Sequence, residues 1–190
     1  MRGWALAERG QREEGVAQMR QGLAAYRVTG AGRGQSGFLV GLAEAYRKTG
    51  QREEGLNMLA EALAAVDKTG ERYYEAELYR LKGELTLQQS KVQGPKSKVE
   101  KSPESEVRSP ESEAEECFLK AIDIARRQSA KSLELRAVMS LSRLWQRQGR
   151  RAEARQMLAE IYGWFTEGFD TADLQEAKAL LEELSVPSEA

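Results

Sequence analysis

The side chains that most often carry catalysis or bind metals are scarce in this sequence. It contains no histidine and a single cysteine, Cys117, so the commonest general base is missing and a Cys/His metal site cannot be assembled. Paired acids such as Glu13 with Glu14 and Glu53 with Glu54 stand where negative charge favours the start of a helix. We therefore expect no enzyme, no metal site and no cofactor. Cys117 is interpreted as a half-buried structural thiol.

One glycine motif imitates a nucleotide-binding loop. Residues 32–37 read Gly-Arg-Gly-Gln-Ser-Gly, which matches G-x-G-x-x-G. That fingerprint binds a pyrophosphate where it follows a strand and opens a helix inside a βαβ unit. Here it follows a predicted helix that ends near Gly30, and the sequence shows no strand pattern. We interpret the motif as a loop between helices.

Charge is distributed unevenly along the chain. Residues 120–155 contain ten basic and three acidic side chains, whereas residues 156–190 contain one basic and eight acidic ones. Such an asymmetry can steer a charged partner, or it can let neighbouring helices complement each other. The sequence leaves both interpretations open.

A repeat predicts the elements that must position these charges. The segment Gln-Arg-Glu-Glu-Gly occurs at 11–15 and again at 51–55, and a fixed period of this size is typical of stacked repeat proteins. A small, a large and a compact residue also recur at positions i, i+4 and i+7, which lie on one helical stripe. The four copies of this stripe are Gly15-Met19-Gly22, Gly55-Leu59-Ala62, Ala114-Phe118-Ala121 and Ala154-Leu158-Ile161.

The register predicts four helix pairs and a final helix. The pairs span 2–9 with 12–27, 36–49 with 52–68, 72–88 with 112–127, and 131–148 with 151–166; the final helix spans 171–184. The repeats then occupy about 1–30, 31–70, 71–129 and 130–168, followed by a capping helix at 170–185. Four aromatic residues at helical spacing are predicted to lie in the core: Tyr46, Trp145, Tyr162 and Trp164.

The third copy is longer than the others by about nineteen residues. Residues 90–111 are rich in Ser, Pro, Glu and Lys and contain few large apolar side chains. Such a segment buries too little surface to offset its ordering entropy. We predict a disordered insertion between the two helices of this copy.

The small-large-small stripe in the second helix of each pair, together with an aromatic residue in the first helix, resembles the tetratricopeptide repeat (TPR). The spacing of 40 residues exceeds the ~34 of that family, and residues 41–85 and 143–184 look like the long-helix repeats at the C-terminal end of bacterial predicted ATPases fused to adenylate cyclase or kinase modules. The resemblance implies an all-α fold, a right-handed α–α superhelix of about four helix pairs with a C-terminal capping helix.

The resemblance also implies a binding face, because the first helices of such repeats line the concave side and hold proteins or peptides. The planar guanidinium of arginine can bind both oxygens of a carboxylate, so an acidic protein or peptide is the expected ligand. The alternative is that these residues form an ordinary solvated helix face. The candidate binding residues are Glu44, Arg47 and Lys48 in copy two, Arg80 and Glu84 in copy three, and Arg136, Arg143 and Arg147 in copy four.

We therefore expect a cytoplasmic, non-enzymatic interaction or scaffold module, the regulatory or sensor repeat region of a bacterial signalling ATPase or a fragment of one. Sensing of a small effector is the alternative function. Nucleic-acid binding through residues 120–155 is disfavoured by the acidic segment beside them, and no apolar run approaches the ~20 residues of a membrane helix. No earlier repeat covers Trp4 and Leu6. Because uncovered apolar ends of a solenoid tend to find partners, we expect a homodimer through the uncapped N-terminal repeat.

Overall fold

The computed structural model describes residues 2–30, 34–92 and 109–186 of the chain. In this part of the chain the regular structure is helical, with no strand. The helices are α1 (Arg2–Glu8), α2 (Arg12–Val28), α3 (Gln35–Thr49), α4 (Arg52–Thr69), α5 (Glu75–Val92), α6 (Pro110–Arg127), α7 (Lys131–Arg147), α8 (Arg151–Tyr162) and α9 (Ala172–Ser185). The predicted all-α fold is confirmed.

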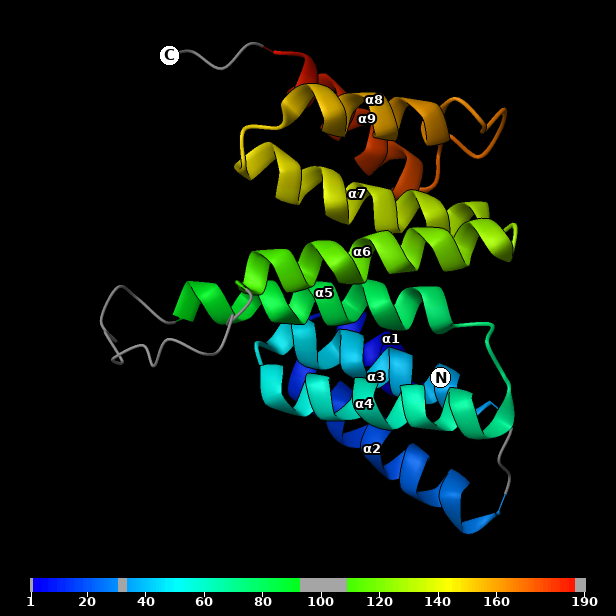
Figure 1. The fold of residues 1–190 in the computed structure, drawn as a ribbon. Coiled ribbons are helices and arrows are strands. Elements are labelled where there is room, and N and C mark those ends of the chain that lie inside the picture. The colour runs from blue at the N-terminus through cyan, green and yellow to red at the C-terminus, as the bar shows by residue number, and fades with distance from the viewer. Residues whose placement is uncertain (1, 31–33, 93–108, 187–190) are drawn as a thin grey trace, which may run out of the picture.

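The helices form a stack in which each packs against the next along the chain. Figure 1 shows α2 at one end, α5 and α6 in the middle, and α8 with α9 at the other end. The first helices of successive pairs also touch each other: α3 packs on α5, α5 on α7, and α7 on α9. These four helices therefore share one face of the solenoid, and side chains from all of them can meet there.

The repeat stripes form the core between paired helices. Leu59, Phe118 and Leu158, the central members of the last three stripes, are each 1% exposed or less, and Tyr46 and Trp145 are buried as predicted. Helices α5 and α6 approach each other closely at Gly83 in α5. A Cβ atom at this position would lie 2.5 Å from a ring carbon of Phe118 in α6. A side chain at this position would separate α5 from α6.

The first stripe is only partly buried, which the sequence pattern did not indicate. Gly15 is buried, but Met19 is half-buried and Gly22 is exposed. The reason is the length of α1, whose seven residues cover only the first half of α2 at ~1.5 Å per residue. Trp4 on α1 is correspondingly 55% exposed.

The two helices that flank the long insertion reach further toward it than the predicted ends at residues 88 and 112. Helix α5 continues to Val92 and α6 begins at Pro110, so both helices extend into the segment 90–111; residues 93–108 lie outside the described part of the chain. Helix α6 starts early because the Ser109 side chain accepts a hydrogen bond from the Ser112 backbone N–H at 3.2 Å, and proline suits the first turn of a helix. At its other end, α5 begins at Glu75 rather than at residue 72.

The prediction of a buried Trp164 is wrong. Helix α8 ends at Tyr162 instead of continuing to residue 166, so Trp164 lies in the following turn and is 58% exposed. The Lys131 Nζ atom lies 5.8 Å from the centre of its ring. Trp164 is spaced from the preceding aliphatic residues as if it continued the buried face of α8. Because α8 ends two residues earlier, the ring leaves that face and is exposed.

Candidate functional site

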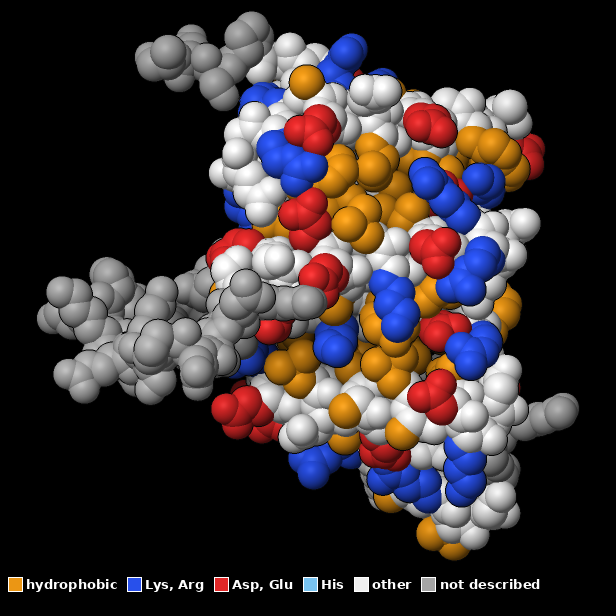
Figure 2. Space-filling model, in the orientation of Figure 1, with side chains coloured by type: hydrophobic (Ala, Val, Ile, Leu, Met, Phe, Trp, Pro, Cys, Tyr) orange, Lys and Arg blue, Asp and Glu red, His pale blue; other side chains and the backbone are white. Residues whose placement is uncertain are grey.

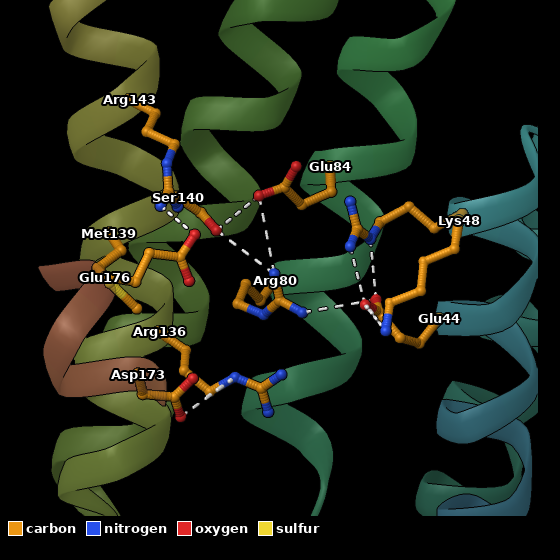
Figure 3. Close-up of a pocket in the computed structure, with 11 residues that line it drawn as sticks. Glu44, Lys48, Arg80, Glu84, Arg136, Met139, Ser140, Arg143, Asp173 and Glu176 are labelled. Carbon is orange, nitrogen blue, oxygen red and sulfur yellow. Dashed lines mark hydrogen bonds and ion pairs between the residues drawn. The ribbon is translucent and has the colours of Figure 1, made fainter. Parts of the chain in front are cut away.

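Side chains of α3, α5, α7 and α9 surround a groove of about 430 Å³ (Figure 3). Seven of the eight predicted binding residues line it, and Arg147 does not. Arg147 is the last residue of α7 and is exposed. The lining residues are Glu44, Arg47, Lys48, Arg80, Glu84, Arg136, Met139, Ser140, Arg143, Asp173 and Glu176.

Arg80 forms the floor of the groove and is buried. The side chain is 8% exposed, because α5 is covered by α3 on one side and by α7 on the other. Its Nε and Nη2 atoms donate to the two carboxylate oxygens of Glu77, each at 2.8 Å. Burial lowers the pKa of Arg80, but the hydrogen bonds and charge of Glu77 outweigh burial and raise it overall. The guanidinium is thus a fixed positive charge.

Two further carboxylates lie near Arg80 from different helices. Glu44 of α3 is 3.8 Å from its Nη2 atom, and Glu84 of α5 is 3.7 Å from Nη1. Ser140 of α7 donates its hydroxyl to Glu84 at 2.7 Å and accepts from Arg80 Nη1 at 3.5 Å. The network connects side chains of three first helices across the floor of the groove.

The α3 wall of the groove carries its own ion pairs. Arg47 donates to both oxygens of Glu44 at 2.8 Å, and Lys48 Nζ lies 3.9 Å from the same carboxylate. Burial raises the pKa of Glu44, but the Arg47 hydrogen bonds and the nearby cations outweigh burial and lower it overall. The same hydrogen bonds raise the pKa of Arg47. Arg47 and Lys48 remain 26% and 31% exposed, so both can still reach a ligand.

The opposite wall pairs two arginines of α7 with two carboxylates of α9. Arg143 Nη2 lies 2.6 Å from Glu176, and Arg136 Nε lies 3.9 Å from Asp173; Arg136 Nη1 is also 3.2 Å from the buried Glu77. Sequence reasoning missed Asp173 and Glu176 as site residues. The available signals were their i, i+3 spacing on the last helix and the acidic excess beyond residue 156.

The groove is therefore a charged surface in which both signs are balanced. Five basic and four acidic side chains line it, and charges of both signs are also interspersed over the side of the molecule in Figure 2. Among the described residues, no three potential metal ligands of the His, Cys, Asp or Glu type come together. No helix in the described ranges is long and apolar enough to cross a membrane. The arrangement suits recognition of a charged segment through exchange of ion pairs.

Comparison with known proteins identifies relatives in structure alone. No family model matches this chain, and no match was found among curated protein sequences. The fold is similar to the crystal structure of the nearly identical TPR-like repeats of a kinesin light chain candidate from Podosopora anserina, with a TM-score of 0.63, 18% identity, and coverage of 96% of this chain and 81% of that one. A single-residue variant of that protein gives a TM-score of 0.61 at 19% identity, covering 96% and 89%.

Both comparisons concern the fold, because the identities are too low to carry a function. They cover almost the whole chain. The chain therefore has the fold of TPR-like repeat proteins.

Proposed function

We propose that this chain is a protein-interaction module that binds an acidic segment of a partner protein in the groove between α3, α5, α7 and α9. The observation that carries the proposal is the convergence of seven charged residues, taken from three successive first helices, on one groove. TPR-like neighbours support the scaffold class. The protein acts by binding and not by catalysis.

The exposure of the cations supports an acidic ligand. Arg80 is fixed at the floor, whereas Arg136 and Arg143 are 36% and 37% exposed at the wall. A guanidinium has five N–H donors, so each of these arginines retains donors after its present ion pair. A carboxylate that enters the groove can therefore meet two or three cations in succession.

The lining favours a peptide over a small organic effector. Met139 is the only apolar side chain among the residues that line the groove. Pockets for small organic ligands are lined mainly by apolar and aromatic groups that exclude water. Sensing of a small effector consequently remains an alternative only for a strongly charged molecule.

The wider context that we propose is the regulatory or sensor arm of a bacterial signalling ATPase in the cytoplasm. Its support is the resemblance of residues 41–85 and 143–184 to the long-helix repeats of such proteins. The arrangement of the gene tests this context. An ATPase encoded in the same reading frame or directly beside it supports the proposal, and its absence from both places in related genomes contradicts it.

Fluorescence anisotropy with labelled peptides tests the binding function. A short Glu/Leu peptide should bind wild-type protein, and a Lys/Leu peptide of the same length should not. Reversal of one wall charge, Arg143→Glu, should weaken binding of the acidic peptide about tenfold or more, and Arg136 is left unchanged because it also contacts the buried Glu77. The matched control is Arg127→Glu, since Arg127 is 68% exposed on α6 and does not line the groove.

Two results would contradict the proposal. One is equal binding of both peptides by the wild-type protein. The other is an equal loss of affinity in the wall variant and in the Arg127 control, because the effect would then reflect net charge and not the groove. Circular dichroism should show that both variants keep the helical content of the wild type.

A further inference from the structure

Helix α9 places two carboxylates on the arginines that line one wall of the groove. Glu176 contacts Arg143 at 2.6 Å, and Asp173 lies 3.9 Å from Arg136. Figure 3 shows Glu176 directed toward Arg143, and Asp173 beside the Nε atom of Arg136, whose guanidinium extends away from α9 toward the middle of the groove. Glu176 thus already occupies a position at which an incoming carboxylate would meet Arg143, and Asp173 places a second negative charge next to Arg136.

These two ion pairs are far more exposed than the network at the floor. The side chains of Arg143 and Glu176 are 37% and 58% exposed, and those of Arg136 and Asp173 are 36% and 43% exposed. The floor pair of Arg80 and Glu77 is 8% and 5% exposed. Exposed pairs contribute little to stability and exchange readily. The α9 carboxylates can therefore be displaced without disturbing the floor.

The attachment of α9 to the solenoid does not depend on these carboxylates. Its apolar face is buried against α7 and α8 through four residues. Asp173 and Glu176 lie on the groove side of the helix, apart from that apolar face. The buried residues are Leu174, Ala177, Leu180 and Leu184. Removing the two charges should consequently leave the helix in place.

We propose that α9 is an autoinhibitory element, whose Asp173 and Glu176 compete as built-in ligands with the carboxylates of an acidic partner for Arg136 and Arg143. The inference rests on the proposed acidic-segment function and deepens it. A partner must displace both carboxylates, so the groove discriminates against isolated acidic residues. Segments that present several carboxylates at once, at the spacing of Asp173 and Glu176, are favoured because they replace both pairs together.

The test compares the affinity of a labelled hexaglutamate peptide for four proteins. Asp173→Asn with Glu176→Gln removes both charges while keeping side-chain size, and it should bind the peptide about tenfold more tightly than the wild type at low salt. The matched control, Glu182→Gln with Glu183→Gln, makes the same charge change at exposed positions of the same helix, away from the groove. It should stay close to the wild type.

The fourth protein adds Arg143→Glu to the double α9 variant, and the gain in affinity should disappear. Equal affinity of the wild type, the α9 variant and its control would overturn autoinhibition. In that case the binding function stands if binding of the Glu/Leu peptide still depends on Arg143. A gain of the same size in the control variant would also overturn the inference, because net charge would then explain it. Unchanged helical content by circular dichroism shows that α9 has not melted.

Discussion

Replacing Arg80 with methionine tests whether the floor of the groove depends on a buried ion pair. The substitution keeps most of the length and the apolar packing of the side chain but removes its charge. Glu77, which is 4% exposed, then loses both of its 2.8 Å hydrogen bonds to Arg80 and keeps only Arg136 at 3.2 Å. The Glu77 carboxylate then remains buried with one of its two arginine partners.

The magnitude follows from that burial. Removing one member of a buried pair costs about 3–5 kcal/mol, because the remaining charge stays desolvated. Since Arg136 still contacts Glu77, we expect Arg80→Met to lower the free energy of unfolding by about 3 kcal/mol. Adding Glu77→Gln removes the orphaned charge and should restore about 2 kcal/mol. The control Arg127→Met breaks a surface pair with Asp123, whose side chains are 68% and 67% exposed, and should change stability by less than about 0.5 kcal/mol.

Urea denaturation followed by circular dichroism measures these differences. The midpoint should fall for Arg80→Met, recover in part for the double variant, and remain unchanged for Arg127→Met, with similar slopes throughout. The reasoning is refuted if Arg80→Met is no less stable than Arg127→Met. It is also refuted if Glu77→Gln lowers stability further in the Arg80→Met background, since the carboxylate would then not be an uncompensated charge.

Three further predictions concern packing, pH and capping. Gly83→Ala should destabilise the protein by about 1–2 kcal/mol because its Cβ meets a buried phenylalanine ring, whereas Gly41→Ala, with no atom within 4 Å of its Cβ, should stabilise α3 by about 0.5–1 kcal/mol; a less stable Gly41 variant would contradict the comparison. The pKa of Glu44 is lowered in the folded state, so its contribution to stability is present above its ordinary value of 4.5 and is lost as pH falls through the lower folded value. The Arg47→Met variant should therefore lose less stability than the wild type between about pH 6 and about pH 3, which urea midpoints at each pH can check. Ser109→Ala should cost about 1 kcal/mol and speed amide exchange in the first turn of α6; unchanged exchange would show that the cap in this structure is not used.

Much of the fold could be predicted from periodicity, because a helix carries its apolar stripe locally. The 40-residue register placed Leu59, Phe118 and Leu158 in the core, where each is almost fully buried. Errors occurred at residues whose spacing is helical but which no neighbouring helix covers in the folded protein. Trp164 has helical spacing but lies beyond the end of α8, and Gly22 has stripe spacing but lies beyond the reach of the short α1.

The candidate site could be predicted in part. Seven of its residues follow from placing flanking positions on the first helices, since those helices stack side by side. Arg147 does not reach the groove because it is the last residue of α7. Asp173 and Glu176 were missed because they belong to a helix that the sequence identified only as a cap.

The sequence by itself determined the helical elements, their order and the stripes that join them, since each depends on spacing within a few turns of one helix. Only the tertiary structure decided which charges meet. Arg80 is buried because α3 and α7 cover α5 from both sides, and Arg143 is paired because α9 brings Glu176 to it from 33 residues away. Long charged side chains find partners across helices, and these partners depend on how the helices stack, which periodicity within a single helix does not specify.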